Sequence, residues 1–307
     1  MLSTTSARRA MFRSAGAPRG FTIVELLVVI GVIAILSSLI LAGLSGAMRT
    51  AAKTRELNSL RQVFQAWTIY SSNYNDYFMP AHLDENTQTK WGVTYRDRGG
   101  NVLPAAQCVG YGWRLAGYLD YELDPLLGYL STRVLEWDAD PANIATLRGQ
   151  VADRPAFGLN SFFVGGWWTN SSPDGTPSML FDDAPIPGLI ARTAGSLARA
   201  SEQIVFASST LRPPGTHKSV QGDEETSGSP YVDAPLLPTG QAWAPALGDP
   251  SSVVVTGGAH STPFARYNRT VATCTGDGGT SGISLRDVSD MRRWTNPATG
   301  PEWNYGN

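Results

Sequence analysis

The strongest pattern along the chain is an apolar run near its N-terminus. Residues 21–48 read FTIVELLVVIGVIAILSSLILAGLSGAM, and Glu25 is the only charged residue among them. An α-helix rises about 1.5 Å per residue, so about 20 apolar residues are enough to cross the hydrocarbon core of a bilayer. The run therefore predicts a membrane-spanning helix.

Residues 49–70 continue the helical pattern in amphipathic form. Their large apolar side chains recur every three or four positions and define one stripe: Leu57, Leu60, Phe64 and Trp67. This spacing is typical of a helix with one buried face. We therefore expect one helix over residues 21–72, with residues 21–48 in the membrane and the stripe packed in a head domain. Glu56 and the basic residues around it are expected on a solvated or interfacial surface.

The helical period ends at a polar segment closed by Pro80, which indicates a stop. Residues 73–307 are expected to form the head. Short alternating runs occur there between turn formers, and the 32 Gly and 20 Pro of the chain favour short strands over a helical bundle. We expect an α+β fold, in which the long N-terminal helix packs on a β-rich head with an antiparallel sheet.

Several runs in the head predict individual elements. Residues 201–208 (SEQIVFAS) predict a central strand, and residues 91–95 (WGVTY) predict a short one. A three-stranded meander is expected over residues 264–285, with a hairpin turn at its Asp-Gly-Gly sequence. Residues 212–250, rich in Pro, Gly, Ser and acids, predict a flexible loop.

The charge distribution predicts an orientation. Residues 1–20 contain no acid and four of the 24 basic residues: Arg8, Arg9, Arg13 and Arg19. The positive-inside rule places this end in the cytoplasm and the head on the other side of the membrane. The remaining 20 basic residues stand against 26 acidic ones, a formal charge of −6, so the composition gives no indication of nucleic-acid binding.

Glu25 has a physical explanation if the chain is cut after Gly20. A carboxylate within a spanning helix is costly and is usually functional. Cleavage would create an α-amino group on Phe21, four residues before Glu25, and residues four apart share a helix face. The carboxylate can then pair with the Phe21 terminus of its own chain or of a neighbour. Such a pair would neutralise both charges in the apolar layer and fix the axial register between subunits.

Residues 19–30 (RGFTIVELLVVI) resemble the prepilin leader of type IV pilins and type II secretion pseudopilins. The resemblance implies that residues 1–20 are a leader, that a prepilin peptidase cuts between Gly20 and Phe21, and that Phe21 is then N-methylated. It also implies that Glu25 acts in assembly. The chain departs from many relatives because it has no proline between residues 21 and 79. A plain signal anchor is the alternative interpretation of the apolar run.

The resemblance also implies a location and partners. We expect a bacterial single-pass protein of the inner membrane, with the N-terminus in the cytoplasm and the head in the periplasm or outside. After assembly the protein would be part of a filament. Its partners would be the prepilin peptidase, other pilin or pseudopilin subunits and an inner-membrane assembly platform.

Two head segments resemble a subgroup, the large pseudopilin-like proteins of planctomycete and verrucomicrobial type. Tyr267, nine intervening residues and then Asp277-Gly278 fit the spacing of the subgroup's His-x9-Asp-Gly signature, with Tyr in place of His. Residues 156–161 (AFGLNS) resemble its Ser-Tyr-Gly-Met-Asn strand. The resemblance assigns no activity to this head motif.

The sequence shows no catalytic signature, so we expect no enzyme. The three histidines are far apart, and neither a Gly-x-Ser-x-Gly elbow nor a Walker A motif is present. We expect no metal site, although calcium bound in the head is an alternative, because acidic clusters occur at 120–124, 182–183 and 223–225. Cys108 and Cys274 are either a disulfide or two buried thiols, and the sequence does not decide between them.

Two functions from different classes follow. The first is a structural subunit of a type II secretion pseudopilus or a type IV pilus-like filament. The alternative is a membrane-anchored extracytoplasmic binding module for a polysaccharide or an exported protein. Most of the nine tryptophans are expected in the core or at interfaces. Trp167-Trp168 is the best candidate for contacts with a ligand.

Overall fold

The computed structural model describes residues 20–128, 152, 154–170, 172, 174–182, 186–212, 228–247, 253–257, 260–267 and 269–305. The chain divides into two compact units, Met1–Met48 and Arg49–Asn307. The N-terminal 19 residues of the expected leader lie outside the described residues, and so do Asp183, Asn268 and the acidic cluster at 223–225.

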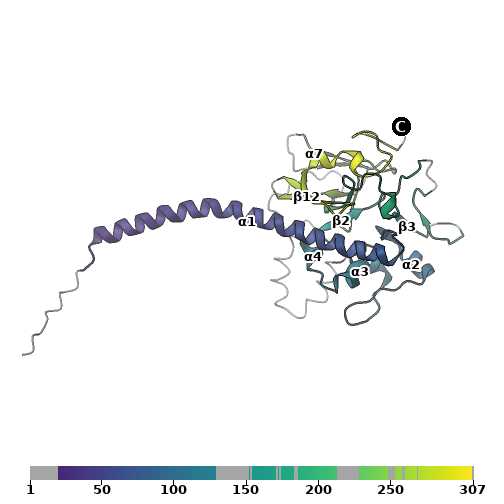
Figure 1. The fold of residues 1–307 in the computed structure, drawn as a ribbon, viewed down its shortest axis with the longest axis horizontal. Helices are drawn as coiled ribbons and strands as arrows, with labels where there is room; N and C mark the ends of the chain where they lie inside the picture. The colour runs from purple at the N-terminus through teal and green to yellow at the C-terminus, as the bar shows by residue number, and fades with distance from the viewer. Residues whose placement is uncertain are drawn as a thin grey trace, which may run out of the picture. The chain divides into compact units, whose positions relative to one another are not determined.

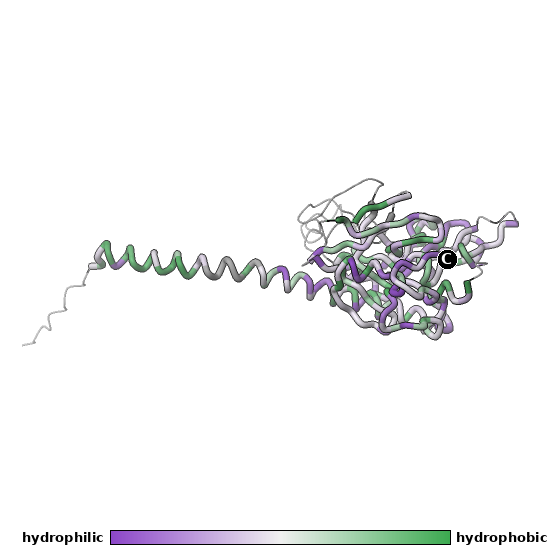
Figure 2. Tube along the Cα trace, turned by 90° about the horizontal axis from the view of Figure 1, so that it is seen from above, coloured by the Kyte–Doolittle hydropathy of each residue, from purple (hydrophilic) through white to green (hydrophobic). Residues whose placement is uncertain are grey.

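The expected long helix is present as α1, Ile23–Asn73, and its bounds differ from the prediction by one or two residues. The first unit contains its N-terminal part, where the apolar side chains described are exposed, for example Leu27 at 63% and Ile33 at 55%. The hydropathy colouring of Figure 2 shows this part as mostly hydrophobic. Among the residues that the structure describes, no helix combines the length and the hydropathy needed to cross a membrane.

Within the second unit, the C-terminal part of α1 is built into the head. Leu60 and Trp67 of the predicted stripe are buried, and Leu57 and Phe64 are partly buried against the same core. The Trp67 ring lies 4.5 Å from that of Phe78, between ring centroids. Figure 1 shows the last turns of α1 between β12 and α7 on one side and α3 and α4 on the other.

The expected position of Glu56 on a solvated surface is wrong. Its side chain is buried and forms an ion pair with Arg266, which is buried as well. The Arg266 Nη2 atom also donates to the carbonyl oxygens of Ala156, at 2.9 Å, and Ser209, at 3.2 Å. The sequence pattern of α1 gave no sign of this partner, because Arg266 lies 210 positions further along the chain.

The head is β-rich, with mostly antiparallel pairing. Its largest sheet has seven strands, and the main path runs β10-β11-β5-β2-β6, with β12 paired to β11 and β9 paired to β5. The bounds are β2 Phe157–Asn160, β5 Ile204–Arg212, β6 Tyr231–Val232, β9 His260–Pro263, β10 Ala265–Tyr267, β11 Thr270–Thr275 and β12 Thr280–Ser284. Among the described strands of this sheet, only β2 and β6 pair in parallel.

Two smaller sheets accompany it. One has the order β1-β3-β4, formed by His82–Leu83, Trp167–Thr169 and Ser178–Met179. The other is the antiparallel pair β7, Ala242–Pro245, and β8, Val253–Thr256. Strands β6 and β7 fall within residues 212–250, so part of the predicted flexible loop is regular structure. Residues 213–227 and 248–250 of that loop lie outside the described residues.

Short helices and 3-10 turns complete the head. These are α2 Glu85–Trp91, η1 Ala105–Cys108, α3 Tyr111–Ala116, η2 Gly117–Leu119, α4 Asp124–Leu127, η4 Ala194–Ser196, α7 Leu285–Val288 and η5 Met291–Arg293. The predicted strand at 91–95 is wrong, because Trp91 ends α2. Asp84 caps that helix by accepting from the Thr87 N–H at 2.7 Å, and Gly92 ends it with a φ of 65°.

The core has two hydrophobic clusters, and neighbouring residues of β11 contribute to different ones. Ala272 and Cys274 belong to the cluster that contains Trp67 of α1, whereas Val271 belongs to the cluster that contains Trp294. Alternate residues of a strand point to opposite faces. The predicted central strand at 201–208 and the predicted meander at 264–285 are confirmed by β5 and by β10-β11-β12.

Candidate functional site

The expected processing junction lies directly before α1. Gly20, Phe21 and Thr22 are not helical, and Phe21 is 81% exposed. A Cβ atom added at Gly20 would meet no atom within 4 Å. The peptide bond between Gly20 and Phe21 is therefore in an exposed, irregular segment, the form of chain that a peptidase can bind.

Thr22 and Glu25 close the helix end in a reciprocal capping box. The Thr22 Oγ1 accepts from the Glu25 N–H at 3.2 Å, and the Glu25 Oε2 accepts from the Thr22 N–H at 2.8 Å. The Thr22 hydroxyl also donates to the Glu25 Oε2 at 2.9 Å. Thr-x-x-Glu before an apolar run is the sequence signal for a capping box. The role expected for Glu25 rested on its charge alone and did not include this signal. The carboxylate is thus held at the first turn of α1.

The head motif residues Tyr267, Asp277 and Gly278 do not form one site. Tyr267 ends β10 and pairs with Thr270, the first residue of β11, whereas Asp277 lies two positions after Thr275, the last residue of β11. A strand of six residues separates them, or roughly 17–20 Å at the usual strand rise.

Asp277 and Gly278 form the tight turn between β11 and β12. The Asp277 Oδ1 accepts from the Thr275 hydroxyl at 2.6 Å and from the Gly279 N–H at 3.0 Å. These two hydrogen bonds lower the pKa of Asp277. Gly278 has a φ of 86°, and a Cβ atom there would lie 3.0 Å from the Phe64 ring of α1. The turn therefore packs against the long helix.

The structure describes Cys108 and Cys274 as two reduced, buried thiols. Cys108 is in η1 and Cys274 in β11, and both belong to the cluster around Trp67. Burial raises the pKa of Cys274 to about 12, so its thiol is protonated at neutral pH.

Two carboxylates of the expected acidic clusters form ion pairs with arginines. Glu122 pairs with Arg98 at 3.0 Å on an exposed surface, and Asp182 pairs with Arg192. Within the described part of the chain, no group of three or more His, Cys, Asp or Glu side chains is placed to hold a metal ion.

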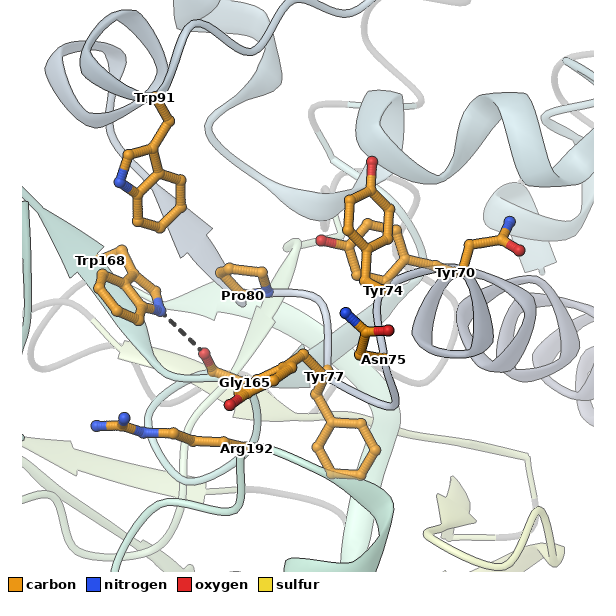
Figure 3. Close-up of a pocket in the computed structure, with 11 residues that line it drawn as sticks. Tyr70, Tyr74, Asn75, Tyr77, Pro80, Trp91, Gly165, Trp168 and Arg192 are labelled. Carbon is orange, nitrogen blue, oxygen red and sulfur yellow. Dashed lines mark hydrogen bonds between the residues drawn. The ribbon is translucent and has the colours of Figure 1, made fainter.

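Six of the described tryptophans lie either in the core or at a pocket. Four are buried in the core, namely Trp67, Trp113, Trp243 and Trp294. Trp167 stacks on the His82 ring, with centroids 4.0 Å apart. Trp91 and Trp168 instead line a cavity of about 430 Å³ with three tyrosines, two asparagines, Phe78, Pro80, Gly165 and Arg192. Figure 3 shows Trp91 and Trp168 on one side of this pocket and the rings of Tyr70 and Tyr74 on the other.

The comparisons with known proteins add to the N-terminal site alone. Residues 17–41 match the family model described as the prokaryotic N-terminal methylation motif. No curated protein and no solved structure matches the chain. The motif is of prepilin type and implies a prepilin-like protein that is processed by a prepilin peptidase. It suggests a membrane-anchored extracytoplasmic protein with a structural role.

Proposed function

We propose that this protein is a pilin-like or pseudopilin-like filament subunit. In this proposal the peptidase cuts between Gly20 and Phe21, Phe21 is N-methylated, and residues 21–48 become the part that packs in the filament core. The observation that carries the proposal is the methylation motif at residues 17–41, which contains the Thr22–Glu25 capping box. The filament is a type II secretion pseudopilus or a type IV pilus-like fibre.

The exposed apolar side chains of the first unit are consistent with burial first in a bilayer and then in a filament. Val24, Leu26, Leu27 and Ile30 are each more than half exposed in the isolated chain. Side chains of this kind are stable only against lipid or other apolar side chains. A bilayer would cover them before assembly, and helices of neighbouring subunits would cover them in the filament. The basic residues before Gly20 would keep the leader on the cytoplasmic face.

Glu25 supplies the register in this proposal. In the uncut chain its carboxylate already accepts from Thr22, the residue after Phe21. Cleavage would add a positive α-amino group on Phe21, the residue next to Thr22. A carboxylate that is already fixed in one rotamer loses little further entropy when it pairs with that amine. The pairing would neutralise two charges that are costly in an apolar layer.

The second unit, Arg49–Asn307, contains the head and is the larger of the two, so we propose a specialised or minor subunit rather than a compact major one. It would lie in the periplasm or outside the cell. Other pilin or pseudopilin subunits and the assembly platform of the inner membrane would be its partners.

Assembly can be tested by shearing. In cells that make the prepilin peptidase and an assembly platform, the mature chain should appear in a sedimentable sheared fraction together with other subunits. Without the platform, the processed chain should remain in the membrane fraction. Mature chain that is never found outside the membrane fraction, under conditions in which other subunits assemble, would contradict the filament role.

A further inference from the structure

The aromatic pocket of the head is a built cavity that the filament role does not use. It lies between the segment that follows α1, the end of α2 at Trp91, strand β3 at Trp168, and the backbone at Gly165 and Arg192. Its volume of about 430 Å³ falls in the range of about 300–1,000 Å³ that is usual for small-molecule sites. All its lining residues belong to the second unit.

The pocket walls are aromatic side chains, and some of them are exposed. Tyr74 and Trp91 are 52% and 44% exposed. On one side the rings of Tyr70 and Tyr74 stack, with centroids 4.4 Å apart and planes at 25°. On the other side Trp91 meets Trp168 at 5.0 Å and 65°. Figure 3 shows the two pairs on opposite sides of Pro80.

The pocket floor is held in place by backbone contacts. The Phe78 N–H donates to the Arg192 carbonyl at 2.7 Å, and the buried Arg114 donates to the Pro80 carbonyl at 2.8 Å. Gly165 has a φ of 72°, and a Cβ atom there would lie 2.2 Å from the Met79 carbonyl oxygen. Such fixed supports mean that little ordering is required when a ligand binds.

The pocket is close to neutral and is edged by polar groups. Among the described residues that line it, Arg192 is the only charged one, and its guanidinium pairs with Asp182. Asn73, Asn75 and Tyr77 add amide and hydroxyl groups that can donate and accept hydrogen bonds. Figure 3 shows the Asn75 amide below the rings of Tyr70 and Tyr74, and the Tyr77 ring beside Gly165 and Arg192.

We propose that this pocket binds a neutral oligosaccharide segment. A sugar ring has an apolar C–H face, which packs on an aromatic ring, and hydroxyl groups around its edge, which need donors and acceptors. Flat aromatic walls with a few polar groups and no unbalanced charge match both requirements.

Other ligand classes fit these contacts less well. A quaternary ammonium ligand would also favour aromatic walls, but its ammonium group forms no hydrogen bond with the amide and hydroxyl groups of Asn73, Asn75 and Tyr77. A proline-rich peptide docks along an extended aromatic-lined groove, and its parallel titration distinguishes it from a sugar. Folded proteins bury about 800 Å² per partner, far more than this pocket provides.

The test uses the full chain in a detergent whose headgroup is neither a sugar nor a choline, because either could compete. Cellohexaose, chitohexaose, mannohexaose and laminarihexaose are titrated, with tryptophan fluorescence and calorimetry as the readouts. Choline, polygalacturonate and a proline-rich peptide are titrated in parallel. We expect saturable binding of at least one neutral hexasaccharide with a Kd below about 1 mM, which corresponds to a binding free energy of roughly 4 kcal/mol.

Two variants locate the binding. Trp91→Ala removes an exposed side chain and should weaken the binding about tenfold. Trp303→Ala is the matched control, because Trp303 lies against the second hydrophobic cluster and outside the pocket. The affinity of this variant for the hexasaccharide should stay within about twofold of the wild-type value. Circular dichroism checks that both variants fold.

Three results would overturn the proposal. The first is that no neutral hexasaccharide shows saturable binding. The second is binding that Trp91→Ala leaves unchanged. The third is tighter binding of choline, polygalacturonate or the peptide than of any neutral hexasaccharide. None of these results bears on leader cleavage or on filament assembly, so the two proposals fail separately.

Discussion

Thr22 and Glu25 cap one another at the first turn of α1, with the Glu25 carboxylate 2.8 Å from the Thr22 backbone nitrogen. Glu25 therefore has a structural role in the uncut chain, before any role in assembly. A loss of assembly on removal of Glu25 has two explanations, a weakened helix start or a missing negative charge.

The variant Glu25→Gln distinguishes these explanations. Glutamine at this position retains the capping box but lacks the charge. If the charge pairs with the Phe21 amine, Glu25→Gln should be cleaved normally but yield at least about tenfold fewer filaments. A tenfold change corresponds to a loss of roughly 1.4 kcal/mol of pairing free energy. Electron microscopy of sheared filaments measures this. Glu25→Ala is the control that removes both functions, and normal filament numbers from Glu25→Gln would rule out the pairing.

Glu56 and Arg266 predict a large stability effect, because both side chains are buried. Glu56→Ala should lower the free energy of unfolding by about 3–5 kcal/mol, since it leaves a buried guanidinium without its carboxylate. Urea unfolding of the full chain in detergent, followed by tryptophan fluorescence, measures the change. The double variant Glu56→Leu with Arg266→Met should recover most of the loss. A Glu56→Ala variant as stable as the wild type would mean that the pair is not buried in solution.

Gly278 can be compared with Gly240, because both have a left-handed φ, 86° and 81°. A Cβ atom at Gly240 would meet nothing within 4 Å, whereas one at Gly278 would press on Phe64 of α1. Gly240→Ala should cost about 1–2 kcal/mol of backbone strain. Gly278→Ala should cost at least about 1 kcal/mol more, because of the crowded helix contact. Equal losses in urea unfolding would indicate that the turn does not pack on α1.

His82 predicts a dependence of head stability on pH. Burial lowers the pKa of His82 to about 4, with a further contribution from Arg114, while its Nδ1 atom lies 2.8 Å from the Tyr231 hydroxyl. The unfolded chain binds a proton near pH 6.5 and the folded chain does not, so stability should fall as the pH decreases from about 6.5 to about 4.

The slope in that window should approach about 1.4 kcal/mol per pH unit from this group. His82→Asn is the matched variant, because its amide oxygen can accept in place of the Nδ1 atom. Urea unfolding at several pH values should show a shallower slope for His82→Asn than for the wild type. Identical slopes would show that His82 is not the titrating group.

The sequence predicts best where a pattern is local. The three- and four-residue spacing in α1 identified Leu60 and Trp67 as core, and the alternation in residues 264–285 identified the meander. The placement of Glu56 was wrong because its partner, Arg266, is brought to it by the sheet and not by the sequence pattern of α1. The strand predicted at 91–95 was wrong because the helix that Asp84 caps includes Trp91, and Gly92 then ends that helix in a left-handed conformation.

The pocket shows the same limit. Trp168 was singled out with Trp167, but only Trp168 lines the cavity, since Trp167 stacks on His82. Trp91 lies 77 positions earlier and carried no signal of its own. Its place beside Trp168 depends on the fold of the smaller sheet and α2, which no local spacing encodes.

Mass spectrometry of the N-terminal peptide tests the central claim most directly. Protein extracted from membranes of cells with an active prepilin peptidase should begin at N-methylated Phe21. Gly20→Val should retain the leader, and because a Cβ atom at Gly20 meets no neighbour, this loss would report peptidase recognition and not misfolding. A wild-type chain that retains residues before Phe21 in the presence of the active peptidase would contradict the account.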